Sequence, residues 1–282
     1  MTMRMRRTAA ALAAGLLALA TAACGDDGDA ATGIIDKAAK DKKLVIGVKA
    51  DQPGLGLQTG SGYEGFDIEI ARIVAKGLGV DAGAIEWKTT VSSNREPFIE
   101  QRQVDLVVAT YTISEDRKKK VNFAGPYYQA GQDLLVPTNS TITGPESLDG
   151  KRVCSAVGST PAKRIKADFP RAKLEEFDTY SKCVEALGGG RVDAVTTDDI
   201  ILAGYAAQPQ YAGKFKVVGK QFSEEPYGIG LHKSDKAGCE KVNEILKAAI
   251  ADGSYKAAWD KTLGSSGTPA PTPDTSKLTH CG

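Results

Sequence analysis

Short apolar runs of strand length alternate along the chain with longer segments whose apolar residues recur at helical spacing. Runs at 44–48, 85–89 and 106–109 predict buried strands. Between the first two runs, residues 66–78 carry apolar side chains at a period of about 3.6, which predicts a helix. This alternation predicts a parallel sheet with helices packed on it, and therefore an α/β fold.

The same alternation begins again near residue 145 and defines a second unit. After this unit, 227–231 returns to the first unit and 236–263 supplies closing helices. Two connections, at about 133–137 and 223–228, therefore join the units. In the second unit we expect strands at 151–157, 173–177, 192–196 and 215–218, and helices at 160–168, 179–187 and 198–207.

We therefore predict two α/β lobes joined by two crossover strands, with the second lobe inserted into the first. Lobe 1 comprises 44–132 and 228–263, and lobe 2 comprises 133–227. Residues 24–43 are rich in small and charged side chains, which predicts a flexible stalk that becomes helical near its end. Residues 264–282 are rich in Ser, Thr and Pro, which predicts a tail without a packed core.

Residues 1–23 have the features of a targeting segment. Three arginines precede an apolar run at 9–20, and small residues then lead to Cys24. This ending resembles a lipoprotein signal, in which the cysteine is acylated and becomes the mature N-terminus. Thr21 is unusual at its place in such a signal, so a simple secretory signal is the alternative. No later apolar run reaches about 18 residues, and we expect no further membrane span.

The charge balance is close to neutral. The sequence carries 36 Lys and Arg against 35 Asp and Glu, and removing the three arginines of the targeting segment leaves 33 basic residues. Such a balance argues against nucleic acid as a partner. The sequence has two histidines and no C-x-x-C motif, so we expect neither a metal site nor a cofactor.

Four cysteines remain if Cys24 is acylated, and four cysteines allow three pairings. Export to an oxidising compartment favours disulfides over free thiols. Cys154 and Cys183 both fall in lobe 2, whereas Cys239 falls in the closing helices and Cys281 in the tail. We therefore favour the pairs Cys154–Cys183 and Cys239–Cys281.

Hydroxyl side chains crowd the exit of the predicted strand at 106–109. Residues 110–112 read Thr-Tyr-Thr, and Ser114 with Arg117 three residues later indicates a helix start. Small ligands bind at the carboxyl ends of strands in open α/β sheets, and a guanidinium beside hydroxyls suits a carboxylate. On spacing alone, the alternative is a surface turn in which Arg117 pairs with a neighbouring acid.

Residues 105–128 read D-L-V-V-A-T-Y-T-I-S-E-D-R-K-K-K-V-N-F-A-G-P-Y-Y. This pattern resembles the signature of extracellular solute-binding proteins for polar amino acids, the capture subunits of ABC importers. The resemblance extends through most of 44–263. It implies a two-lobed periplasmic-binding-protein fold of type II. It also implies that the ligand's α-carboxylate is held by Ala109, Thr110, Thr112 and Arg117.

In lobe 2, Ser159 and Thr160 stand before a proline, which predicts a capped helix start with N–H groups that can bind an anion. A capped helix without a ligand is the alternative, and the resemblance assigns this turn to the ligand's carboxylates. The sequence D-A-V-T-T-D at 193–198 is similar to the family's D-A-V-x-x-D, whose last aspartate binds the α-ammonium. The resemblance implies that Asp198 binds the ligand's α-ammonium and that Thr197, beside it, also belongs to the site. Either Asp198 or Asp199 is expected to cap the next helix.

Two short stretches resemble the branch of the family that binds acidic amino acids. They are Ser93-Asn94-Arg95-x-Pro97 and Val48-Lys49-x-Asp51, in which the resemblance directs Arg95 and Lys49 toward the ligand's second carboxylate. The alternative is that both are solvated surface charges. Two cations in one pocket would select glutamate or aspartate, because a neutral ligand leaves them unpaired. Candidates for an aromatic lid are Tyr63, Tyr111 and Tyr227.

The resemblance implies an extracytoplasmic, lipid-anchored and monomeric binding protein that is not an enzyme. It would capture free glutamate or aspartate and deliver it to the permease subunits of an ABC importer. One alternative is a general binder of polar amino acids such as glutamine. Others are a dehydratase-like enzyme on the same scaffold, disfavoured because no histidine lies near the expected site, and a receptor's sensing domain.

Overall fold

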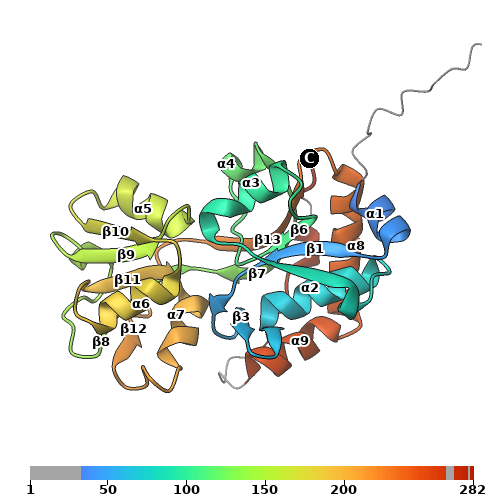
Figure 1. The fold of residues 1–282 in the computed structure, drawn as a ribbon. Coiled ribbons are helices and arrows are strands. Elements are labelled where there is room, and N and C mark those ends of the chain that lie inside the picture. Colours follow the sequence, from blue (N-terminus) through green and yellow to red (C-terminus); the bar gives the residue numbers. More distant parts are fainter. Residues whose placement is uncertain (1–32, 265–269, 279) are drawn as a thin grey trace, which may run out of the picture. The chain divides into compact units, whose positions relative to one another are not determined.

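The computed structural model describes residues 33–264, 270–278 and 280–282 (Figure 1). The expected targeting segment and Cys24 lie outside these residues. The first described helix, α1 (Ile34–Asp41), falls in the expected stalk. It buries Ile34 and Ala38, and the N–H of Ile34 donates to Oδ2 of Asp235 over 2.7 Å. This part of the expected stalk is therefore a packed helix, because one of its faces is apolar.

Lobe 1 is built on a five-stranded sheet in the order β5-β1-β6-β13-β7. The first three strands are parallel, and β13 is antiparallel to both of its neighbours. The strands are β1 (Leu44–Val48), β5 (Ile85–Thr89), β6 (Leu106–Val108), β7 (Val121–Ala130) and β13 (Glu225–His232). The helices are α2 (Phe66–Gly77), α3 (Arg95–Glu100), α4 (Glu115–Lys118), α8 (Lys236–Ala251) and α9 (Ser254–Thr262), with 3₁₀ turns η1 (Ala82–Ala84) and η2 (Ser92–Asn94).

Lobe 2 has its own five-stranded sheet, in the order β10-β9-β11-β8-β12. Here β9, β10 and β11 are parallel, whereas β8 is antiparallel to both β11 and β12. The strands are β8 (Gln132–Pro137), β9 (Arg152–Ala156), β10 (Lys173–Phe177), β11 (Ala194–Asp198) and β12 (Phe215–Val217). The helices are η3 (Pro145–Ser147), α5 (Thr160–Asp168), α6 (Tyr180–Gly188) and α7 (Asp199–Ala206).

The parallel arrangement predicted for the strands at 44–48, 85–89 and 106–109 is confirmed, whereas the two strands that connect the lobes are antiparallel. β7 continues through Gly131 into β8, and β13 pairs with β7 from Glu225↔Ala130 to His232↔Val121. The two connecting strands run in opposite directions because the chain leaves lobe 1 on one and returns on the other. The first crossing therefore lies at Gly131, slightly before the expected 133–137, since those residues already belong to the sheet of lobe 2.

A third, small sheet lies between the predicted strand at 44–48 and the predicted helix at 66–78, where no strand was expected. It is a meander of β2 (Asp51–Gln52), β3 (Gly56–Thr59) and β4 (Gly62–Glu64). Short strands of this kind carry too few alternating residues to be recognised in the sequence. The meander places residues 51–64 directly after β1, at the carboxyl end of the sheet of lobe 1.

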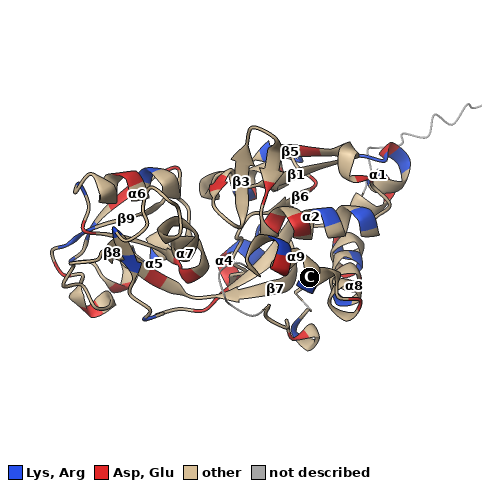
Figure 2. Cartoon of the chain, turned by 90° about the horizontal axis from the view of Figure 1, so that it is seen from below, with Lys and Arg blue, Asp and Glu red and all other residues tan. Residues whose placement is uncertain are grey.

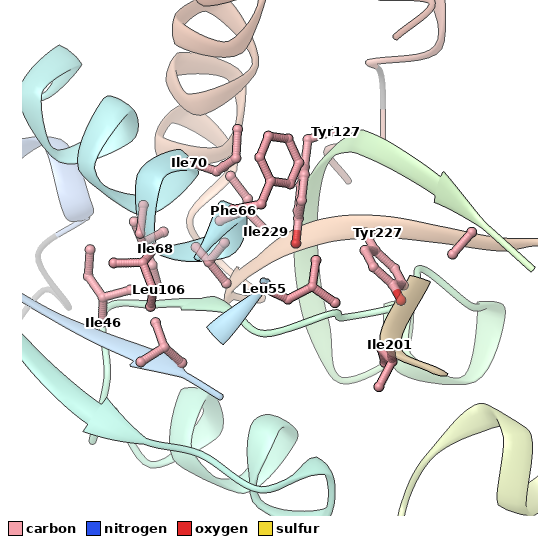
Figure 3. Packing of buried hydrophobic residues seen from close by; sticks show 14 of the residues in the cluster. Ile46, Leu55, Phe66, Ile68, Ile70, Leu106, Tyr127, Ile201, Tyr227 and Ile229 are labelled. Carbon is pink, nitrogen blue, oxygen red and sulfur yellow. The ribbon is translucent and has the colours of Figure 1, made fainter. Parts of the chain in front are cut away.

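The core of lobe 1 is aromatic at the junction with the connecting strands. Phe66 is fully buried, and its ring lies 5.3 Å from Trp259, 5.4 Å from Tyr255 and 6.2 Å from Tyr127. Figure 3 shows Phe66 beside Tyr127, with Tyr227 further along β13. Large rings bury much apolar surface, so this cluster fixes α2 and α9 against β7.

The expected tail is held to lobe 1 where the structure describes it. Leu278 is buried, Cys281 is bonded to Cys239 of α8, and the N–H of Gly282 donates to Asn122 over 3.1 Å. A second disulfide joins Cys154 to Cys183 in lobe 2. Both pairings are those favoured by the placement of the cysteines. The expectation of an unpacked tail is wrong for these residues because the disulfide and Leu278 anchor them.

Charged residues of both signs are distributed over both lobes (Figure 2). Among the residues described, no helix is long and apolar enough to span a membrane. Nor do His, Cys, Asp and Glu side chains gather anywhere in the described part of the chain in a group that could hold a metal ion.

Candidate functional site

Buried polar side chains gather where strands of both lobes end. Lys49 follows β1, Thr110 follows β6 and Asp198 ends β11, and each is at most 5% exposed. An open groove of 430 Å³ beside Pro53 and Gly204 is lined by none of these three. The candidate site is therefore the enclosed polar cluster, whose further members include Gln52, Asp67, Ser92, Arg95, Thr112, Arg117, Ser159 and Thr197.

Arg117 is buried and faces the junction of the lobes. Its Nε donates to Oε1 of Glu96 over 2.9 Å, Nη1 to the carbonyl of Thr112 over 2.8 Å, and Nη2 to the carbonyl of Gly158 over 3.1 Å. The last bond crosses from lobe 1 to lobe 2. The surface-turn alternative is therefore wrong, because α4 turns the guanidinium inward. Ser114 caps α4, as expected, by accepting from the N–H of Arg117.

Arg95 and Arg117 both contact the ring of one tyrosine. The guanidinium carbons lie 4.5 Å (Arg95) and 5.0 Å (Arg117) from the ring centroid of Tyr111, a cation–π arrangement. Burial, and then the charge of Arg117, lowers the pKa of Arg95 to about 10. Nη1 of Arg95 donates to the carbonyls of Ala109 at 3.1 Å and Thr110 at 2.9 Å, so this side chain also shapes the loop after β6.

Lys49 is the third cation of the cluster and is 3% exposed. Its only hydrogen bond to a described residue is from Nζ to Oγ of Ser92, over 2.7 Å. Burial lowers the pKa of Lys49 well below its ordinary value, and the charges of Arg95 and Arg117 lower it further. The alternative of a solvated surface charge is therefore wrong for Lys49 and Arg95. In the part of the chain that the structure describes, no acid forms an ion pair with this ammonium group.

Asp67 holds the loop after β6 in an unusual conformation. Thr110 has a φ of 44°, in the left-handed region that β-branched residues rarely adopt. Oδ2 of Asp67 accepts from the N–H of Thr110 over 2.8 Å, and Oδ1 accepts from the hydroxyl of Tyr127 over 2.7 Å. Burial raises the pKa of Asp67 to about 6. The backbone N–H of Thr110, expected to face the ligand, is thus occupied by Asp67.

The first turn of α5 supplies the hydroxyls of lobe 2. Ser159 caps the helix by accepting from the N–H of Ala162 over 3.1 Å. Thr160 donates to Oε2 of Glu225 over 2.6 Å, and its Oγ1 lies 3.3 Å from that of Thr112. Because the hydrogen of Thr160 goes to Glu225, Thr112 is the donor between the two threonines. The structure thereby brings together the expected ligand residues of both lobes.

Asp198 is a buried carboxyl with one free oxygen. Its Oδ2 accepts from the hydroxyl of Tyr227 over 2.6 Å, and its Oδ1 has no partner among the described residues. Burial, and then the charge of Glu225, raises the pKa of Asp198 to about 8. A buried acceptor without a donor is costly, so this oxygen is suited to a ligand cation.

The expectation that Asp198 or Asp199 is the N-cap of α7 is confirmed for Asp198 by its position, without a bond from its side chain. Asp198 occupies the N-cap position, but its carboxyl accepts no helix N–H. Asp199 instead accepts from the N–H of Gly131 over 3.2 Å and from Nε2 of Gln221 over 2.7 Å. It therefore binds the connecting segments, and Asp198 keeps an oxygen for the site.

The three aromatic lid candidates have different places. Tyr63 is on β4, where its hydroxyl lies 2.6 Å from that of Thr89, and none of its contacts given by the structure is with the cluster. The ring of Tyr111 contacts both guanidinium groups, and the hydroxyl of Tyr227 donates to Asp198. None of the three is therefore an exposed lid. Sequence reasoning missed Tyr180, a buried ring at the start of α6 whose raised pKa, about 12, reflects burial and then the charge of Asp198.

Gln52 is a further member that the sequence did not indicate. It is fully buried, its Oε1 accepts from the hydroxyl of Thr110 over 3.1 Å, and its Nε2 has no partner among the described residues. It lies on the short strand β2, and only the meander brings it to the site. Asp67 had a visible signal, since it belongs to the Gly65-Phe66-Asp67 helix start, but its contact with Thr110 depends on the fold.

The described residues of the site are suited to binding a zwitterion. On one side are cations, and on the other is a carboxyl with a free oxygen. Such a pair of surfaces suits a small molecule with carboxylate and ammonium groups.

Comparison with known proteins agrees with this description. Residues 44–265 match the bacterial extracellular solute-binding proteins, family 3. The glutamate-binding protein GluB of Corynebacterium efficiens is 41% identical over 92% of this chain and 91% of its own length. The ABC transporter glutamine-binding protein GlnH of Bacillus subtilis is 38% identical over 78% of this chain and 81% of its own. A solved structure of an ancestral arginine-binding protein bound to glutamine has a TM-score of 0.74 and 37% identity, over 79% of this chain and 98% of that one.

Proposed function

We propose that this chain, which belongs to the bacterial extracellular solute-binding proteins of family 3, captures an acidic amino acid, glutamate before aspartate. It acts outside the cytoplasm and passes its ligand to the permease of an ABC importer. The two relatives of the GluB type, each 41% identical, support glutamate as the ligand. Acylation of Cys24 would hold the chain at the outer face of the cell membrane.

The ligand lies in the enclosed cluster between the lobes. Its α-carboxylate is held by Arg117 with Thr112 and the first turn of α5, and its ammonium by Asp198. The free Oδ1 of Asp198 supports this orientation, because an ammonium would supply the missing donor. The pKa of Asp198 is raised to about 8, and the positive charge of the ligand's ammonium would lower it. Asp198 therefore loses its proton when the ligand binds.

The observation that carries the acidic specificity is the buried ammonium of Lys49, which has one hydroxyl partner among the described residues. A carboxylate at the far end of the ligand would neutralise it, whereas a neutral amide would leave it unpaired. The Nε2 of Gln52, which has no partner among the described residues, is a further donor for such a carboxylate.

Glutamine is the second candidate ligand, because relatives of 38% and 40% identity are named glutamine-binding proteins. Calorimetric titration of the purified protein with glutamate, aspartate and glutamine separates the two. We expect glutamate to bind at least about tenfold more tightly than glutamine, or ~1.4 kcal/mol. Chromatography of the released ligand should recover it unchanged, as required of a carrier and not of a dehydratase.

Lys49→Met tests the residue that carries the proposal, since methionine fills a similar volume without the charge. We expect this substitution to weaken the binding of glutamate more than the binding of glutamine. The ratio of the two affinities should therefore become smaller. Lys76→Met, on the exposed face of α2, is the matched control and should leave both affinities unchanged. If the wild type binds glutamine as tightly as glutamate, the acidic specificity is refuted, and capture of polar amino acids in general remains.

A further inference from the structure

The site can be reached only if the lobes separate. Lys49, Arg117 and Asp198 are each at most 3% exposed, so an amino acid cannot enter while the lobes are in contact. The contacts across the cleft therefore form after the ligand has entered, by a hinge motion at the connecting strands. Any group that strengthens these contacts without touching the ligand contributes to affinity.

One such contact completes a helix of the opposite lobe. The N-cap residue of α6, Thr179, makes no capping hydrogen bond with its side chain. Instead, Oδ2 of Asp51 in β2 of lobe 1 accepts from the N–H of Ser181 over 3.1 Å. Ser181 is the second residue of α6, a position at which N-cap side chains bond, and a carboxylate is favourable at this end of the helix dipole. Lobe 1 therefore caps a helix of lobe 2.

The neighbouring helix binds the same residue. The hydroxyl of Tyr205, in α7, donates to the backbone carbonyl of Asp51 over 2.5 Å and lies 3.0 Å from its Oδ2. Tyr205 is buried, so its hydroxyl needs an acceptor when the lobes are closed. Asp51 thus contacts both helices of lobe 2 that face the meander of lobe 1 (Figure 1).

Gly204 allows the close approach on which these bonds depend. It lies inside α7, and a Cβ at this position would stand 2.4 Å from the carbonyl oxygen of Pro53 in lobe 1. Its φ is not in the left-handed region, so the helix itself does not require glycine here. Alanine has a higher helix propensity than glycine, so glycine at this position does not favour the helix. Its advantage is that it allows the two lobes to approach closely.

We propose that Asp51 and Gly204 are positioning residues that form a latch between the lobes. The β2–β3 turn docks on α6 and α7 as the cleft closes, and the capped helix stabilises the closed arrangement. Asp51 acts on the ligand through closure, whereas Lys49, two residues earlier, acts on it directly. This inference rests on the proposed binding of an amino acid between the lobes.

Gly204→Ala gives opposite expectations for stability and affinity. Without ligand, the thermal midpoint of the full chain should stay unchanged or rise, because alanine favours the helix. Glutamate should bind at least about tenfold more weakly by calorimetry, because the added methyl group meets Pro53. Gly188→Ala is the matched control, since its Cβ would meet only the ring of Phe215 at 3.7 Å, and its affinity should equal that of the wild type.

Asp51→Ala and Asp51→Asn separate capping from charge. Both remove the carboxylate charge near Lys49, but asparagine caps helices about as well as aspartate. We expect Asp51→Ala to weaken glutamate binding at least about tenfold and Asp51→Asn to restore most of the loss. With both proteins saturated with glutamate, hydrogen exchange at the amide of Ser181 should be faster in Asp51→Ala than in the wild type, because the cap forms when the lobes close.

The outcomes distinguish the latch from the proposed function. If the wild type binds no amino acid, the proposed function fails, and the latch fails with it because it rests on that binding. If the wild type binds glutamate and Gly204→Ala binds it equally well, the latch is refuted. Equal losses in Asp51→Ala and Asp51→Asn would also refute the cap, because they would trace the effect to charge alone.

Discussion

Tyr227 donates its hydroxyl hydrogen to Oδ2 of Asp198 over 2.6 Å, so a connecting strand supports the carboxyl that we assign to the ligand's ammonium. Tyr227 pairs with Tyr128 across the two connecting strands, and the Thr112↔Tyr227 bridge places it beside the loop that follows β6. The hinge region, lobe 1 and lobe 2 therefore meet at this hydrogen bond.

Tyr227→Phe should weaken glutamate binding about tenfold at pH 7, or ~1.4 kcal/mol. Loss of the hydroxyl removes a donor that stabilises the ionised carboxyl, so the pKa of Asp198 rises further and more of it must deprotonate on binding. Calorimetry at pH 7 and pH 9 checks this, and the loss should be smaller at pH 9. Tyr211→Phe, in the turn after α7, is the control. A loss that is the same at both pH values would indicate a purely structural role.

The raised pKa of Asp198 makes the ligand-free chain less stable as pH rises. The folded pKa of about 8 lies above the ordinary value of 3.8, so between these values the native state binds the additional proton. Its contribution is complete below the ordinary pKa and is lost as pH rises through about 8. The chemical-denaturation free energy should therefore fall between pH 5 and pH 8. Asp198→Asn should reduce this fall by at least ~1 kcal/mol, whereas Asp81→Asn, at an exposed acid, should not.

Arg95 and Lys49 should differ when their charges are removed, although the sequence presents them as equivalent cations. Arg95→Met leaves the carbonyl of Thr110 without its side-chain donor and removes one of the two donors to the carbonyl of Ala109. We therefore expect a stability loss of about 2 kcal/mol and weaker binding of glutamate and glutamine alike. Lys49→Met removes a poorly paired buried charge, and the ligand-free chain should become no less stable. For both variants, thermal unfolding measures the stability of the ligand-free chain, and calorimetric titration measures the affinity for glutamate and glutamine. If Arg95→Met were to change only selectivity, its role in shaping the loop would be disproved.

The Cys239–Cys281 disulfide should stabilise the fold without affecting the ligand. It joins residues separated by 42 positions, for which loop entropy predicts roughly 3–4 kcal/mol. Replacing both cysteines by serine should lower the unfolding midpoint and leave the affinity for glutamate within about twofold, because the bond lies on α8, outside the cluster. A large loss of affinity in the folded variant would show that the C-terminal segment influences the site.

Local sequence determined the elements and the chemistry of the loop after β6. The apolar run at 44–48 gave β1 with its observed bounds, because a buried strand needs a largely apolar sequence. The bounds predicted for β5 and β10 are also those observed, although these two strands mix apolar and charged residues. Ser114 and Ser159 were recognisable as caps, since a hydroxyl at the N-cap bonds within its own turn. The separate placement of the cysteines in two lobes was sufficient to favour the observed disulfides.

Tertiary structure alone decided the pairings between segments far apart in the chain. The partner of Arg117 is Glu96 and not an acid of its own helix, and Asp198 receives its hydrogen bond from Tyr227 and not from α7. Gln52 and Asp51 enter the cleft only because β2 follows β1 at the sheet's carboxyl end. Such contacts depend on how distant segments pack in the folded chain. Hydrogen bonds form only at about 3 Å, whereas sequence patterns report neighbours along the chain.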